Sequence, residues 1–200
     1  ALLPVTISFI QLFVYGIILT WAVVALGVVF AYYLLEINGN SIDYLTKLRS
    51  RRKIEEIIRG LIEKNQGFIA IMIDLEYFKS INDKYGHKTG DEVLVHFSKV
   101  LNKAFGKQNY ISRVGGDEFM IVLKNDTMES IPQYKEKIKA ELQQYEDLDF
   151  LSEIDFSFGF KFFPSNNQIT TDIVFDEVDI LMYQDKSKNK NLQRRSTDKK

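Results

Sequence analysis

The chain has 200 residues, 46% of them hydrophobic, and a formal net charge of -1. This length is enough for one domain with a sizeable core and a further segment. The charge is unevenly placed, because residues 1–35 contain none of the 26 basic and 27 acidic side chains. That asymmetry excludes a uniformly soluble chain and favours a membrane segment joined to a soluble domain. Cysteine is absent, so thiol content says nothing about the redox compartment.

A transmembrane helix is predicted within residues 1–35, with the span near residues 13–35. About 20 apolar residues cross a bilayer core, and the uncharged stretch is longer than that. Trp21 and the Tyr32-Tyr33 pair are candidate interfacial anchors. The uncharged length disfavours a buried core helix, and the lack of a basic start or a polar cleavage segment disfavours a cleaved signal peptide. A first residue of Ala suggests a fragment of a longer protein, with the end of a larger membrane region at residues 1–35.

Basic residues follow the predicted span, and they indicate its orientation. Lys47, Arg49 and residues 51–53 lie within the distance over which the positive-inside bias acts. We therefore expect anchoring in the cell (inner) membrane with the soluble domain in the cytoplasm. Residues 36–42 form a short linker, in which Asn38-Gly39-Asn40 resists helix continuation.

Helical periodicity and apolar runs then predict the elements of a domain at residues 43–191, followed by a polar basic tail at 192–200. A helix is expected over residues 51–64, whose apolar positions recur at helical spacing: Ile54, Ile57, Ile58, Leu61 and Ile62. The later elements are a strand at 68–73, helices at 78–85 and 91–105, a hairpin of 110–114 with 119–123, a helix near 128–145, a strand at 155–163 and a helix at 172–188. This order predicts an α+β fold, with helices packed on an antiparallel-rich central sheet.

Two acidic loops stand at strand ends in this plan. Gly115-Gly116 can bend the hairpin and leave backbone free for a ligand, and Asp117 and Glu118 follow directly. Taken alone, such a turn is more often simply exposed. Asp74, however, ends a buried strand, and if the two strands are neighbours these carboxylates converge. An all-oxygen cluster of this kind suits Mg²⁺ or Mn²⁺ and a phosphate-bearing substrate.

The ordered motifs resemble those of the GGDEF family of diguanylate cyclases. The resemblance covers roughly residues 43–191 and recurs at residues 43–48, 51–52, 74–83, 85–91, 115–119, 157–159 and 179–191. Several motifs in family order make it specific. It implies a fold akin to nucleotidyl cyclases and polymerase palms, and a reaction in which two GTP molecules on a homodimer condense to cyclic di-GMP with release of pyrophosphate. The implied partners are GTP, a second copy and the membrane, with no nucleic acid.

The resemblance also implies roles for individual residues. Asp74, Asp117 and Glu118 are the expected catalytic carboxylates, with Asp117 assisting deprotonation, and together with the carbonyl of Leu75 they form the expected metal set. Asn82 and Asp91 occupy the guanine-reading positions, for which an amide and a carboxylate are chemically suited. The expected phosphate and backbone contacts are the amides of Phe78 and Lys79, the side chains of Lys186 and Lys190, and the backbone at Gly115 and Gly116.

The chain departs from the family pattern at several positions. Lys47 and Asn189 replace Gly, Ser50 replaces Asn, Glu76 replaces the commoner Asp, and Lys190 replaces Arg. Residues 106–109 lack the Arg-x-x-Asp of the family's inhibitory product site, so no product inhibition is expected there. Two other functions remain open: a catalytically silent GTP- or cyclic di-GMP-binding regulatory module at the membrane, or a scaffold with a vestigial site. The three carboxylates disfavour both.

Overall fold

The structure, a computed structural model, describes residues 3–37, 41–124, 126–144, 154–165 and 168–197. It divides into two compact units, Ala1–Asn40 and Ser41–Lys200. The described part of the first unit is one helix, α1 (Leu3–Ile37), with no acidic side chain in its first turn and no basic one in its last. Among the described residues, no helix meets the combined length and hydropathy expected of a membrane span. The membrane role of α1 stays a prediction, and the Asn38-Gly39-Asn40 linker lies outside the described residues.

The second unit is an α+β domain with a mixed sheet of five strands. Its elements are β1 (Arg49–Ser50), α2 (Arg51–Glu63), β2 (Phe68–Glu76), α3 (Phe78–Tyr85), α4 (His87–Phe105), β3 (Tyr110–Arg113), β4 (Glu118–Leu123), the 3-10 turn η1 (Met128–Ser130), α5 (Ile131–Gln143), β5 (Asp155–Phe163) and α6 (Thr171–Thr197). The strand order is β1-β3-β4-β2-β5, and within the described part of the chain only the β1–β3 pair is parallel. The expected α+β class and antiparallel-rich sheet are confirmed.

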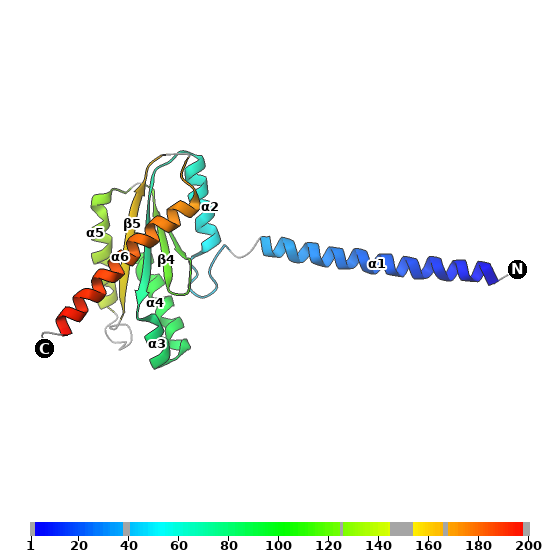
Figure 1. Ribbon diagram of the computed structural model, residues 1–200, viewed down its shortest axis with the longest axis horizontal. Helices are drawn as coiled ribbons and strands as arrows, with labels where there is room; N and C mark the ends of the chain where they lie inside the picture. The colour runs from blue at the N-terminus through cyan, green and yellow to red at the C-terminus, as the bar shows by residue number, and fades with distance from the viewer. Residues whose placement is uncertain (1–2, 38–40, 125, 145–153, 166–167, 198–200) are drawn as a thin grey trace. The chain divides into compact units, whose positions relative to one another are not determined.

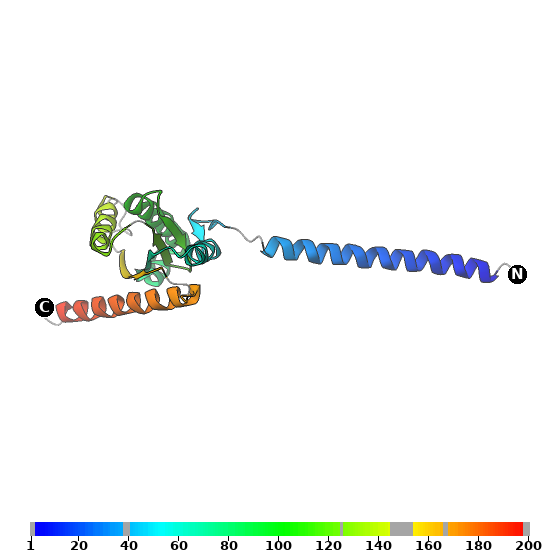
Figure 2. The ribbon, with the colours of Figure 1, turned by 90° about the horizontal axis from the view of Figure 1, so that it is seen from above.

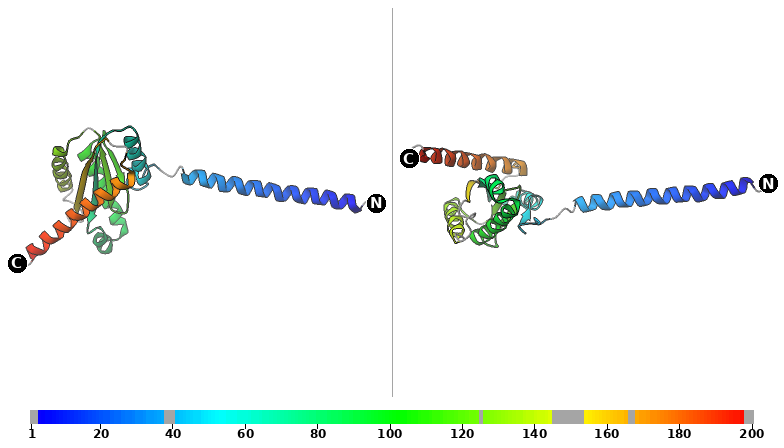
Figure 3. Two further views of the ribbon diagram at one scale, coloured as in Figure 1. Left: turned by 45° about the horizontal axis from the view of Figure 1, so that its top comes forward. Right: turned by 90° about the horizontal axis from the view of Figure 1, so that it is seen from below.

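Helices cover both faces of the sheet, as side-chain alternation along the strands requires. On one face, α4 and α5 pack against the odd-numbered residues of β2, such as Ile71 and Ile73. On the other, α2 and α6 pack against Ala70 and Met72. Figure 1 shows α6 crossing the sheet obliquely, and Figure 2 and Figure 3 show it on the side away from α4 and α5. All nine residues of the central strand β2 are therefore buried.

Close packing of α6 on β5 depends on Gly159. A Cβ at this position would lie 2.6 Å from the Met182 Cα, inside the 3.0 Å that real Cβ atoms keep. The next turn of α6 is tied down by Asp185, whose Oδ2 accepts from the Phe158 backbone N–H at 3.0 Å and from Lys135 Nζ at 3.0 Å. Because β5 is an edge strand, this carboxylate satisfies a donor that no further strand would reach.

Several elements differ in the structure from their expected bounds; the strand expected at 68–73, for example, continues to Glu76 as β2. The helix expected at 91–105 starts at His87, because Gly86 accepts the first backbone bond, from Gly90 N at 3.2 Å. The helix expected near 128–145 begins as η1 and continues as α5, which ends at Gln143. The last helix runs to Thr197 instead of 188, through most of the expected tail. β1 was not predicted, since two residues carry no readable periodicity.

Candidate active site

Asp74 and Glu118 face each other across the β2–β4 ladder. They are register partners in neighbouring antiparallel strands, so their side chains share the sheet face that α6 covers. Asp74 is buried at 7% exposure and Glu118 is partly buried. The apolar run of each strand stops at these residues, which places both carboxylates where the core meets solvent.

The turn between β3 and β4 is shaped around the Glu118 side chain. A Cβ at Gly115 would lie 3.2 Å from Glu118 Cδ and closer still to Oε2, whereas one at Gly116 would meet nothing within 4 Å. Neither glycine has a positive φ. The expected glycine turn is therefore present, but what Gly115 supplies is room for a carboxylate.

The backbone of Asp117 links the turn to the central strand β2 by a hydrogen bond. Its carbonyl accepts from Leu75 N at 3.2 Å. The N–H and C=O of a strand residue point to the same side, so the Leu75 carbonyl also faces the turn. Burial, and next the charge of Asp74, raise the pKa of both Asp117 and Glu118 above their ordinary values of 3.8 and 4.5. This local excess of negative charge is what a bound cation would relieve.

Lys186 supplies one cation from α6. Its Nζ donates to Asp74 Oδ1, one helical turn after the Met182 backbone that rests on Gly159. Burial alone lowers the pKa of Lys186, but the hydrogen bond and charge of Asp74 outweigh it, and the pKa lies above the ordinary 10.5. Beside this pair, buried Glu76 accepts from Ser157 Oγ, so the longer side chain at this family departure is fully engaged.

A second group of predicted residues lies at the start of α3 and α4. Tyr77, between β2 and α3, has a φ of 60°, and this left-handed residue turns the chain so that Phe78 and Lys79 open α3. Asn82 on α3 lies against Gly90 of α4, next in sequence to exposed Asp91. The two expected base-reading residues therefore belong to adjoining helix turns. The side chain of Lys190 lies outside the described residues.

Comparisons with known proteins agree with this architecture. The family model described as "Diguanylate cyclase, GGDEF domain" matches residues 40–192. The chain belongs to the GGDEF family. A probable diguanylate cyclase DgcF of Escherichia coli K12 is 37% identical over 82 residues, covering 40% of this chain and 26% of that protein. A diguanylate cyclase of Vibrio cholerae serotype O1 is 36% identical over 107 residues, covering 52% of this chain and 33% of that protein.

Solved GGDEF structures share the fold. The GGDEF domain of DgcB from Caulobacter crescentus in complex with c-di-GMP superposes with a TM-score of 0.64 at 22% identity, covering 74% of this chain and 91% of that one. The GGDEF domain of PA1120 (TpbB or YfiN) from Pseudomonas aeruginosa gives 0.62 at 26% identity, covering 74% of this chain and 89% of that one.

The donor set of this GGDEF domain fits a divalent cation in kind. Two Asp, one Glu and a backbone carbonyl offer only oxygen, which Mg²⁺ and Mn²⁺ prefer. Among the described residues, however, no three acidic, His or Cys side chains already stand close enough to hold a metal. Asp74 is instead paired with Lys186. The candidate ligands thus lie at one end of the interior strands β2 and β4, and they must move closer together to form a metal site.

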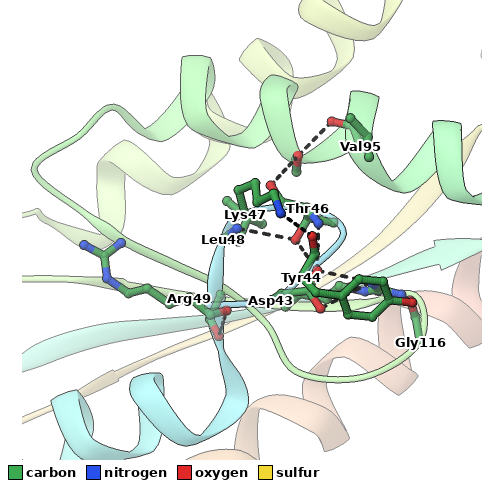
Figure 4. Close-up of polar contacts among 11 residues, drawn as sticks. Asp43, Tyr44, Thr46, Lys47, Leu48, Arg49, Val95 and Gly116 are labelled. Atoms are coloured by element: carbon green, nitrogen blue, oxygen red, sulfur yellow. Dashed lines mark hydrogen bonds and ion pairs between the residues drawn. The ribbon is translucent and has the colours of Figure 1, made fainter. Parts of the chain in front are cut away.

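The GGDEF turn has a further support that the sequence did not indicate. Arg113 donates to the Gly116 carbonyl from Nε at 3.1 Å and from Nη2 at 2.8 Å, and its Nη1 lies 3.2 Å from Asp43 Oδ1. Asp43 in turn accepts from the Thr46 N–H and hydroxyl at 2.8 and 2.6 Å (Figure 4). Burial raises the pKa of Asp43, but these hydrogen bonds and Arg113 outweigh it and hold the pKa below 3.8. Arg113 and Asp43 are 70 residues apart, so no local sequence pattern could indicate that they pair.

Two GGDEF departures acquire a structural reading. Ser50 caps α2 by accepting from Lys53 N at 3.4 Å, a role in which Ser and Asn are equivalent. Lys47, where the family has Gly, has a φ of 59°. At residues 106–109, which lack the Arg-x-x-Asp motif, Gly106 has a φ of 71° and ends α4, while Asn109 is buried with its amide on the Phe105 carbonyl at 2.8 Å.

Proposed function

We propose that this chain is a diguanylate cyclase that condenses two GTP, one on each domain of a homodimer, into cyclic di-GMP and two pyrophosphates. The observation that carries the proposal is the pairing of Asp74 with Glu118 across β2 and β4, with Asp117 at the adjoining turn. Burial, and next the charge of Asp74, raise the pKa of Asp117 and Glu118, so a bound cation would favour the ionised form of these two carboxyls. Their arrangement suits a charge-neutralising site for phosphoryl transfer.

In each half-reaction, a 3′-hydroxyl oxygen bonds to the other nucleotide's α-phosphorus. The bond from that phosphorus to the α,β-bridging oxygen breaks, pyrophosphate leaves, and the hydroxyl proton is lost. Asp117, whose pKa is raised, is suited to accept that proton. A divalent cation held by Asp74, the Leu75 carbonyl, Asp117 and Glu118 would neutralise phosphate charge and favour the deprotonated hydroxyl. Each domain contributes one nucleotide, so the dimer is part of the proposal.

The remaining contacts hold the nucleotide. The free amides of Phe78 and Lys79 at the start of α3 suit the phosphates, since the end of a helix presents unpaired N–H donors. Lys186 is already beside Asp74 and can neutralise phosphate charge when a cation replaces it there. Lys190, from the same helix, is the second proposed phosphate contact. Asn82 and Asp91 are the proposed readers of guanine, and the backbone at Gly115 and Gly116 lies where the reacting phosphates approach.

The chain is further proposed to be anchored in the cell membrane by α1, with the GGDEF domain in the cytoplasm. Residues 1–35 are uncharged, and the described apolar side chains of α1 are exposed, for example Leu12 and Val29. A relative from Staphylococcus saprophyticus, 36% identical over 111 residues, is named an uncharacterized membrane protein. The basic residues that follow α1 support the orientation.

One observation favours a second function, a regulatory module that binds GTP or cyclic di-GMP without turnover. The ammonium of Lys186 occupies the Asp74 carboxylate that a metal would need. Incubation of the full chain in detergent with GTP and Mg²⁺, followed by chromatographic detection of cyclic di-GMP, separates the two. We expect product that Asp117→Ala abolishes. Metal-dependent GTP binding without product, in a sample shown to be dimeric, would favour the regulatory module.

A further inference from the structure

Gly90 of α4 lies directly under the side chain of Asn82. A Cβ at position 90 would stand 2.9 Å from Asn82 Cγ and closer still to Oδ1, and 3.3 Å from Phe78 Cζ. Real Cβ atoms essentially never come within 3.0 Å of such neighbours. Gly90 is buried and its φ is not positive, so no backbone conformation demands glycine here. A side chain at position 90 would therefore have to move the amide of Asn82 away.

Glycine at position 90 lowers the stability of helix α4, and the contact with Asn82 offers a reason for its presence. Within a helix, Gly is about 1 kcal/mol less favourable than Ala. Gly60 of α2 carries that cost against open space, since nothing lies within 4 Å of its Cβ position. At Gly90 the same space is filled by the amide of Asn82. The contact joins α3 to α4 one residue before Asp91.

We infer that Gly90 is a positioning residue for base selectivity: it lets Asn82 lie against α4 beside Asp91, so that both groups meet one guanine edge. The inference rests on the proposed function, which supplies guanine as the base. Guanine and adenine differ at N1, C2 and C6, so a pair of fixed polar groups discriminates them by hydrogen bonds that only one base can complete. A methyl group at position 90 displaces Asn82 from that pair while leaving the carboxylates of β2 and β4 unaltered.

The packing half of the inference is tested without nucleotide. Melting temperatures are compared for the full chain with Gly90→Ala, Asn82→Ala, both changes together, and Gly60→Ala as the matched control. Gly60→Ala should raise Tm by roughly 2–4 °C, as a helix-interior change to Ala does. Gly90→Ala should lower Tm in the native background and raise it in the Asn82→Ala background. A Gly90→Ala that raises Tm in both backgrounds overturns the inference.

The selectivity half uses 3′-deoxy-GTP and 3′-deoxy-ATP, which bind but lack the attacking hydroxyl. The dissociation constant of 3′-deoxy-ATP divided by that of 3′-deoxy-GTP should fall about tenfold in Gly90→Ala, which corresponds to the loss of one hydrogen bond. It should fall no further when Asn82→Ala is added, and Gly60→Ala should leave it unchanged. Native selectivity that survives Gly90→Ala overturns the inference alone. A native chain that does not prefer 3′-deoxy-GTP contradicts the proposed function as well.

Discussion

Arg113 is the residue that holds the tip of the GGDEF hairpin. Its guanidinium donates from Nε and Nη2 to the Gly116 carbonyl and from Nη1 to both carboxylate oxygens of Asp43, and the Arg113 and Asp43 side chains are only 13% and 17% exposed. A planar fork satisfies both partners at once, which an ammonium cannot do. The position of Asp117 therefore depends on a side chain that takes no part in the proposed chemistry.

Replacing Arg113 with Lys should keep the charge and lose the fork. We expect the free energy of unfolding to fall by about 1–2 kcal/mol, because the Gly116 carbonyl loses its two guanidinium donors and the partly buried Asp43 carboxylate loses a planar partner. Cyclase kcat should fall with it as Asp117 becomes mobile. Urea unfolding and steady-state kinetics measure the two effects. Arg52→Lys, at an exposed pair with Glu56, should change stability by less than about 0.5 kcal/mol; equal effects at both positions would contradict this role.

Lys47 occupies a backbone conformation that suits glycine. Its φ of 59° costs a non-glycine residue about 1 kcal/mol. Lys47→Gly should therefore raise Tm by roughly 2–4 °C, even though the exposed bond from its Nζ to the Tyr44 carbonyl is lost. Asn65→Gly, at a φ of 52°, should gain less because Asn adopts this conformation readily. A lower Tm for Lys47→Gly in calorimetry would show that its side chain stabilises the loop.

The raised pKa values of Asp117 and Glu118 predict a site that opposes folding at neutral pH. Both carboxyls bind protons more tightly in the folded state, so their ionisation destabilises it above the raised pKa values. The penalty fades as pH falls through those values and is absent below the ordinary 3.8 and 4.5. Asp117→Asn should thus stabilise the metal-free chain by ~0.5–1 kcal/mol near pH 7.5, and by nothing in strong acid.

Scanning calorimetry in EDTA over a pH series measures that difference. The exposed Asp176→Asn serves as the control and should match the native chain. Added Mg²⁺ should stabilise the native chain and not Asp117→Asn, since only the former keeps the full ligand set. A native chain that is the more stable of the two at pH 7.5 without metal would refute the assignment.

At the level of elements, α6 delivers Lys186 to the carboxylates because it lies unusually close to β5. Gly159 allows that approach and Asp185 fixes the next turn. Gly159→Ala would set a methyl group against the helix backbone, which cannot yield as a flexible side chain does. We expect a loss of about 3 kcal/mol or more in urea unfolding, and cyclase activity lost beyond what the remaining folded fraction explains. A loss below about 1 kcal/mol would mean that α6 can shift freely.

The elements that periodicity predicted are those whose burial is local. The apolar stripe predicted for α2 matches the observed core at Ile54 and Ile58, and the predicted helix α4 buries Val93 and Phe97. The start of α4 was placed too late because Gly86 and Gly90 suggest a loop, whereas Gly90 is helical so that Asn82 can pack on it. That Asp74 and Glu118 lie opposite each other in neighbouring strands was anticipated from the strand ends, whereas their metal-binding role stays a prediction. The supporting contacts were not anticipated, because Arg113–Asp43 and Glu76–Ser157 pair residues far apart in sequence.

For the whole molecule, the two compact units predict separable behaviour. A Ser41–Lys200 fragment should keep the melting temperature of the GGDEF domain, since none of the core residues that the structure describes belongs to the first unit. In liposome flotation, the full chain should rise with the vesicles and the fragment should stay in the aqueous layer. Joining the fragment to a dimerising coiled coil should restore cyclase turnover. A full chain that stays in the aqueous layer would contradict the membrane anchor.

Because Asp74 and Glu118 pair across β2 and β4, the proposed cyclase activity depends on the register of these two strands. Strand side chains alternate, so a slip of one residue between β2 and β4 would send Glu118 to the face that carries Phe119 and Ile121. The slipped molecule could keep much of its compactness, yet its acidic cluster would be split between opposite faces. In the proposed cyclase, cyclic di-GMP would therefore be made only by molecules whose β2–β4 ladder has the native register. Molecules with a slipped register would be inactive, so the amount of product would report the number of correctly folded molecules.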